Sequence, residues 1–205
     1  MRASLTLLVA RLLIAAITAA PLVARAGAQQ YEPLSASVQA AMSRAISDKG
    51  VPQLRFKHPE DGYRWLLEMS DRLAKRIPDS KYRVELLKTV HYEATRAGLD
   101  PQLVLGIIFV ESGFKKYAVS TAGARGLMQV MPFWVGLIGV GEHNLFHLRT
   151  NIRYGCVILR YYLDIEKGDL YRALGRYNGS LGKPEYPNLV LAAWRGTFRY
   201  QGRLA

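Results

Sequence analysis

The sequence predicts a mainly α-helical globular protein, and three observations support this fold class. Apolar residues recur at helical spacing in several segments, and residues typical of helix ends bracket those segments. No segment shows a convincing strand-like alternation of apolar and polar residues. The chain has 205 residues, of which half are apolar. This length and composition are sufficient for a real hydrophobic core.

The first 28 residues have the features of a signal peptide. Arg2 supplies a basic start, an apolar stretch follows with Arg11 inside it, and small residues offer cleavage after Ala26 or Ala28. The alternative is a membrane anchor that stays attached. Small residues and a proline break the apolar run before it could span a bilayer comfortably. We therefore expect an exported, periplasmic protein without a stable membrane anchor.

The charge and the single cysteine narrow the possible partners and chemistry. The formal net charge is +12, and the leader holds three arginines and no acid, so the mature chain stays strongly basic. This favours an anionic or wall-like partner. The signal peptide and the absence of a recognised nucleic-acid motif argue against nucleic acid. Because Cys156 is the single cysteine, the chain cannot form an internal disulfide. The helical, apolar sequence around it favours a buried thiol over a nucleophile.

Residues 29–79 are predicted to form an N-terminal helical extension. A helix within residues 35–50 would end at Gly50, residues 51–62 read as a connector, and a second helix follows from Gly62 until Pro78 stops it. The sequence leaves open whether this extension packs on the rest of the protein or forms a flexible lead-in.

The next two helices are marked clearly at their ends. Residues 80–98 form a helical segment that ends at Gly98. Asp100 is a good N-cap and Pro101 suits the first turn of the following helix, which is apolar nearly all round and should be buried at the centre. Residues 151–169, 170–180 and 186–200 are helical or flank helices.

Glu111 lies near the C-terminal end of this apolar helix. Burial and the negative end of the helix dipole both disfavour a carboxylate there and raise its pKa. From Ser112 to Gly141 there is no other Asp or Glu. A carboxyl that stays protonated near neutral pH can act as a general acid. Most sugar-cleaving sites pair it with a second carboxylate. Only Glu142 is a weak candidate, because Asp164, Glu166 and Asp169 look like solvent-facing charges.

Four ordered motifs carry a resemblance to a known family. They are ESGF at 111–114, VSTAGARGLMQVMP at 119–132, NIRYG at 151–155 and RYNGS at 176–180. Their order and spacing resemble the family 1 lytic transglycosylases, which have a lysozyme-like helical domain. The resemblance covers about residues 80 to 200, so residues 80–205 are expected to be the catalytic domain.

The resemblance implies a reaction on peptidoglycan glycan strands. The family cleaves the β-1,4 bond between N-acetylmuramic acid and N-acetylglucosamine without water and leaves 1,6-anhydro ends. One glutamate acts first as acid and then as base, and no cofactor is required. Two alternatives stay open: a hydrolytic muramidase, and a non-catalytic peptidoglycan-binding protein.

The resemblance also implies the site residues. Glu111 matches the catalytic acid and base, and the hydroxyl of Tyr177 would lie close to its carboxyl. The residues implied to bind or face substrate are Ser120, Gly126, Gln129, Met131, Tyr177 and Asn178. The chain departs from the more frequent Ala-Tyr-Asn-Ala-Gly motif at Arg176, Gly179 and Ser180. This departure affects the expected detail of the sugar-binding subsites more than the expected activity. His143 and His147 have a metal-like spacing, but without an evident third ligand we expect no metal.

Overall fold

The structure is a computed structural model that describes residues 29–202, so the predicted signal peptide lies outside the described residues. The described part is helical, with two isolated β-bridges and no extended strand. The prediction of a mainly α protein is confirmed. The elements are α1 (Ala36–Ile46), α2 (Pro59–Leu73), α3 (Ser80–Arg96), α4 (Pro101–Ser112), α5 (Phe133–Ile138), α6 (Leu148–Ile165), α7 (Leu170–Asn178), α8 (Glu185–Ala192) and a π-helical turn η1 (Ala193–Thr197).

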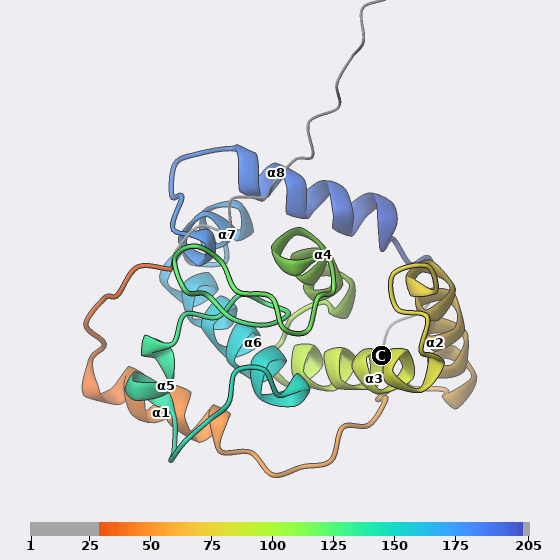
Figure 1. The fold of residues 1–205 in the computed structure, drawn as a ribbon, viewed down its shortest axis with the longest axis horizontal. Coiled ribbons are helices and arrows are strands. Elements are labelled where there is room, and N and C mark those ends of the chain that lie inside the picture. Colours follow the sequence, from red (N-terminus) through yellow and green to blue (C-terminus); the bar gives the residue numbers. More distant parts are fainter. Residues whose placement is uncertain (1–28, 203–205) are drawn as a thin grey trace, which may run out of the picture.

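Helix α4 occupies the centre of the fold, as its apolar sequence predicts. The Asp100 carboxylate accepts hydrogen bonds from the backbone N–H groups of Gln102 and Leu103, and Pro101 fills the first turn. Gly113 ends the helix with a left-handed φ of 57°. Every residue from Pro101 to Ile108 is buried. Helices α3 and α8 and the turn η1 pack around α4 (Figure 1).

The N-terminal extension packs on the rest of the protein. Helix α1 lies against α5 and α6, and α2 packs against α3 (Figure 1). Buried side chains of both helices, among them Met42, Trp65 and Leu73, belong to the same hydrophobic core as α4. Of the two possibilities that the sequence left open, the described residues adopt the packed one. None of their helices is both long and apolar enough to cross a membrane.

The helices of the extension end at other residues than the sequence indicates. Helix α1 ends at Ile46 and not at Gly50, because tertiary hydrogen bonds take over the backbone there. Arg153 donates to the carbonyls of Ile46 and Asp48, and Arg149 donates to that of Gly50. Helix α2 starts at Pro59, inside the expected connector, and ends at Leu73 in a short turn before Pro78.

A cluster of charges ties α1, α3 and α6 together. The carboxylate of Glu93 on α3 is fully buried and accepts hydrogen bonds from Arg96, Arg149 and Arg153. Asp48, just past α1, pairs with the same three arginines. Burial raises the pKa of Asp48, but the Gly50 amide, the Tyr92 hydroxyl and the arginine charges outweigh it and hold that pKa below its ordinary value. This cluster is the main polar link between the extension and the domain.

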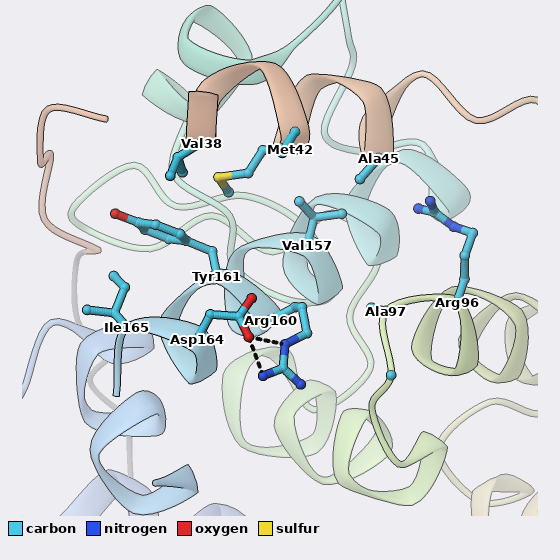
Figure 2. A pocket seen from close by; sticks show the side chains of 12 residues that line it. Val38, Met42, Ala45, Arg96, Ala97, Val157, Arg160, Tyr161, Asp164 and Ile165 are labelled. Atoms are coloured by element: carbon cyan, nitrogen blue, oxygen red, sulfur yellow. Dashed lines mark hydrogen bonds and ion pairs between the residues drawn. The ribbon is translucent and has the colours of Figure 1, made fainter. Parts of the chain in front are cut away.

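A groove between α1 and α6 has a volume of about 680 Å³. Figure 2 shows Val38, Met42 and Ala45 of α1 facing Val157, Tyr161 and Ile165 of α6 across it. Arg160 and Asp164 at its floor pair with each other, with Nη2 and Oδ1 2.6 Å apart. Glu111 does not line this groove. Size alone therefore does not locate the chemistry of this protein.

We predict that Glu93→Gln strongly destabilises the fold. The substitution removes the charge that three partly buried arginines share, and removing one partner of a buried ion pair costs about 3–5 kcal/mol. The measurement is the free energy of unfolding in urea. Asp164→Asn is the matched control, because its pair with Arg160 is largely exposed and is worth about 1 kcal/mol or less. Equal losses in the two variants would contradict the structural role of Glu93.

Candidate active site

Glu111 lies in the last turn of α4 and keeps partial contact with solvent. Its Oε1 accepts a hydrogen bond of 2.6 Å from the hydroxyl of Tyr186 on α8. Loss of water around the carboxyl raises its pKa to about 8, although the Tyr186 hydrogen bond acts in the opposite direction. The carboxyl is therefore mostly protonated at neutral pH, as the position at the end of an apolar helix predicts.

The nearby cations do not neutralise this carboxyl. Lys115 is exposed. The ammonium group of Lys116 lies 5.3 Å from the ring centre of Tyr117 and 5.7 Å from that of Tyr82. Such cation–π contacts hold a cation at an aromatic face. Because these lysines lie elsewhere, burial dominates the pKa of Glu111.

The segment from Gly113 to Pro132 folds back as an irregular loop after α4. Ser112, which follows Glu111, anchors it: the buried hydroxyl can donate to the carbonyls of Ile108 and Leu127, at 3.1 and 2.8 Å. Two isolated bridges, Val119 with Arg125 and Arg125 with Val130, are its regular contacts. The serine of the ESGF motif therefore links the helix that carries Glu111 to the GLMQ segment.

Asn151 of the NIRYG motif fixes the same loop from α6. Its Oδ1 accepts a hydrogen bond of 2.7 Å from the Met128 amide, and its Nδ2 donates to the carbonyls of Arg125 and Leu145, both at 2.8 Å. Gly126 fits tightly beneath this amide. Its φ is +76°, and a Cβ there would lie 2.4 Å from the Asn151 nitrogen. The motif sequence is thus explained by a close approach of loop and helix.

The structure gives Ser120 and Gln129 roles in shaping this loop. The Ser120 hydroxyl accepts a hydrogen bond of 3.0 Å from the Ala124 amide. Gln129 has a left-handed φ of 48° and is buried. Its amide nitrogen donates to the carbonyls of Ala118 and Gly126, at 3.2 and 2.8 Å. The sugar contacts implied for Ser120, Gly126 and Gln129 stay predictions, whereas Met131 is partly exposed at the end of the loop.

The Tyr177 hydroxyl has a hydrogen-bond partner in the loop, and its expected closeness to the Glu111 carboxyl stays a prediction. Tyr177 is fully buried, and its hydroxyl donates a hydrogen bond of 2.8 Å to the Met128 carbonyl and not to Glu111. An unpaired buried carbonyl is costly, which explains this choice of acceptor. Asn178 is also buried and donates to the Ser180 hydroxyl at 2.9 Å. Neither observation tests the substrate contacts implied for this pair.

Tyr186 is the functional residue that sequence reasoning missed. It lies 75 positions after Glu111 and only 6% of it is exposed. The packing of α8 on α4 brings the two side chains together. The sequence signal was limited to a tyrosine at the start of the last apolar helical segment. A contact over this separation depends on helix packing, which periodicity alone does not give.

The other acids considered from the sequence are occupied or exposed. Glu142 is exposed in the segment between α5 and α6. Asp164 pairs with Arg160, and Asp169 caps α7. Glu166 was expected to face solvent, but its side chain is largely buried, because it binds both Arg172 and Arg176. None of these contacts involves Glu111.

His143 has a hydrogen-bonding partner, His147 is exposed, and Cys156 is buried. Nδ1 of His143 lies 2.7 Å from the Tyr154 hydroxyl, and His147 precedes α6. Within residues 29–202 no group of three or more His, Cys, Asp or Glu side chains could hold a metal ion. Cys156 is buried, and burial raises the pKa of its thiol well above the ordinary value. The prediction of a buried thiol is confirmed.

Comparison with known proteins identifies the domain that carries Glu111. Residues 88–186 match the family described as the transglycosylase SLT domain. This part of the chain is therefore a transglycosylase SLT domain, and the predicted family is confirmed.

Individual relatives are similar to parts of the chain. A transglycosylase of Enterobacteria phage PRD1 is 34% identical over 99 residues, which are 48% of this chain and 36% of that protein. Membrane-bound lytic murein transglycosylase C of Actinobacillus pleuropneumoniae is 52% identical over 52 residues, 25% of this chain and 14% of that protein. The chain thus spans well under two thirds of these relatives.

A solved structure shows a partial similarity. It is an inactive mutant of the lytic transglycosylase Slt from Pseudomonas aeruginosa, with a TM-score of 0.42 and 24% sequence identity. The match covers 66% of this chain and 27% of that one.

We predict that Tyr186→Phe raises the pKa of Glu111 above about 8. The variant removes the hydroxyl whose hydrogen bond favours the carboxylate, while the ring still excludes water. The measurement is an NMR titration of the Glu111 side-chain carboxyl. Tyr177→Phe is the control, because its hydroxyl bonds to Met128. A lower pKa in Tyr186→Phe than in the wild type would contradict this arrangement.

We also predict that Glu111→Gln stabilises the protein increasingly as pH rises from about 4.5 to about 8. The pKa of Glu111 is raised from 4.5 to about 8, so folding favours its protonated form. Over this window the unfolded chain ionises Glu111 freely, whereas the folded protein must hold the proton, and wild-type stability falls. A neutral glutamine avoids this loss. Thermal melts of both proteins across the window measure it, and parallel melting curves at every pH would refute it.

Proposed function

We propose that the protein is a peptidoglycan lytic transglycosylase with Glu111 as its only essential ionisable group. The observation that carries the proposal is the carboxyl at the end of α4, bonded by the Tyr186 hydroxyl in a region that matches the transglycosylase SLT domain. Burial raises the pKa of this carboxyl to about 8. The relative in Actinobacillus pleuropneumoniae is named a lytic murein transglycosylase, and this name supports peptidoglycan as the substrate.

The proposed reaction needs one carboxyl and no water. Glu111 gives its proton to the oxygen that links N-acetylmuramic acid to N-acetylglucosamine, and the bond from that oxygen to the muramic acid C1 breaks. The carboxylate then takes the proton of the 6-hydroxyl on the same sugar while the 6-oxygen bonds to C1. The products are a 1,6-anhydro end and a free 4-hydroxyl, and Glu111 regains its proton.

A tethered hydroxyl is a better nucleophile here than water. The 6-hydroxyl is held next to the reacting carbon, so its effective concentration is high. A hydrolase would normally use a second carboxylate to activate water. The sequence from Ser112 to Gly141 offers none, and Glu142 just beyond it is exposed. These features favour internal closure over a muramidase reaction.

We further propose that the enzyme works in the periplasm after its leader is cleaved after Ala26 or Ala28. The leader-like composition of that segment and the basic charge of the chain support this location. Peptidoglycan glycan strands are the proposed partner, with no cofactor.

We predict that the purified protein releases wall fragments that lack a new reducing end. Mass analysis should find products one water lighter than hydrolysis products, and borohydride should leave them unreduced. Glu111→Gln removes the proton donor and should lower fragment release by about 10²-fold or more. Circular dichroism checks that this variant is folded.

Two results would overturn this proposal. Mainly reducible muramic acid ends, or loss of activity in Glu142→Gln, would indicate hydrolysis. Protein that sediments with isolated walls but releases no soluble fragments would indicate a binding protein.

A further inference from the structure

Gln29 is the one residue of the N-terminal extension whose buried amide reaches the loop of the candidate site. Only 3% of its surface is exposed. Its Oε1 accepts hydrogen bonds from the Met131 backbone amide at 3.2 Å and from the indole of Trp134 at 3.0 Å. Its Nε2 donates to the Gln129 carbonyl at 3.4 Å. One side chain thus bonds to Gln129 and Met131 in the GLMQVMP segment and to Trp134 just after it.

Gln29 also interacts with the Tyr177 hydroxyl, which in turn donates to Met128. Gln29 and Tyr177 thus hold the same short stretch of the loop, residues 128–131, by hydrogen bonds. Gln29 does so although it lies 82 positions before Glu111 and outside the matched domain.

The residues after Gln29 attach to both sides of the same region. The ring of Tyr31 packs edge-on against Phe133 on α5, with ring centres 5.7 Å apart. The carboxylate of Glu32 pairs with Arg176 on α7 at 3.2 Å. We call residues 29–35 the strap; Figure 1 shows it in red, passing from beside α7 and the loop to α1.

The strap accounts for one departure from the family motif. Arg176 precedes Tyr177 where the family more often has alanine. Its guanidinium binds Glu166 within the domain and Glu32 of the strap. An alanine at that position could not hold Glu32. The unusual residue next to the Tyr-Asn pair is thus part of the contact that seats the strap.

We propose that the strap is part of the active site, with Gln29 as a positioning residue for the loop that ends at Met131. This inference rests on the proposed lytic transglycosylase activity. A buried glutamine with both its oxygen and its nitrogen engaged fixes the loop in one place. The hydrogen bonds from Met131 and Trp134 hold the end of the loop against α5, and the bond to the Gln129 carbonyl holds the residues before it.

The test compares Gln29→Met with Gln39→Met. Methionine keeps the length and bulk of glutamine but makes none of its strong hydrogen bonds. Gln39 is the matched control, because it also lies in the extension and donates one amide hydrogen bond, of 2.7 Å, to the Leu137 carbonyl. We expect kcat on soluble glycan fragments to fall about 10- to 100-fold in Gln29→Met, because small misplacements at a site are costly. KM should change by about twofold or less, and both constants should stay near wild type in Gln39→Met.

Gln29→Glu should make kcat depend on pH in a way that a purely structural role of Gln29 would not produce. Its carboxylate lacks the donor for the Gln129 carbonyl, whereas the protonated acid has both a donor and an acceptor. The kcat of this variant relative to wild type should therefore recover as pH falls through the carboxyl range. The assay temperature is kept below the melting temperature of every variant. Loss of melting temperature in Gln29→Met with unchanged kcat would overturn the proposal.

A second readout does not depend on activity. The chain has three tryptophans, and the indole N–H of Trp134 gives its own NMR signal. This signal should shift and exchange faster with solvent in Gln29→Met but not in Gln39→Met. If the wild type cleaves no glycan, the proposed function fails, and this comparison still tests whether Gln29 holds the loop. An unchanged Trp134 signal would show that Gln29 does not hold the loop.

Discussion

The burial of one carboxyl at the end of α4 is the constraint on which the rest of the site depends. Helix α4 is apolar on all sides and must lie at the centre, so its last turn brings Glu111 to the edge of the core. There the carboxylate is disfavoured by low polarity and by the negative end of the helix dipole. The Tyr186 hydroxyl offsets this in part, and the cation of Lys116 lies against aromatic rings.

The irregular loop after α4 imposes a second requirement, because its residues 126–130 are buried without a strand or helix to pair their backbone groups. Each such group needs a partner. Ser112, Gln129, Asn151 and Tyr177 supply these partners through their side chains. Residues that a family resemblance assigns to substrate thus also carry the loop. A variant at such a position would alter loop geometry as well as any contact with sugar.

Local signals in the sequence predicted the elements whose ends are set locally. The ends of α3 and α4 follow from Gly98, Asp100 and Pro101, whose effects extend over one turn. The end of α1 was placed too late, because Arg149 and Arg153, about a hundred residues away, capture the backbone there. The site divides in the same way: Glu111 could be predicted from its own helix, whereas its contact with Tyr186 depends on how α8 packs.

The raised pKa of Glu111 suits both halves of the proposed reaction. A carboxyl with a pKa of about 8 keeps its proton at neutral pH, so it is ready to act as an acid. Once it has given up that proton, the same low polarity makes the carboxylate a stronger base than an exposed glutamate. It must then accept a proton from a sugar hydroxyl, which is a weak acid. A second carboxylate close by would raise the cost of this charged state through repulsion. The absence of acids between Ser112 and Gly141 is therefore a requirement of a one-carboxyl mechanism as well as a feature of the sequence.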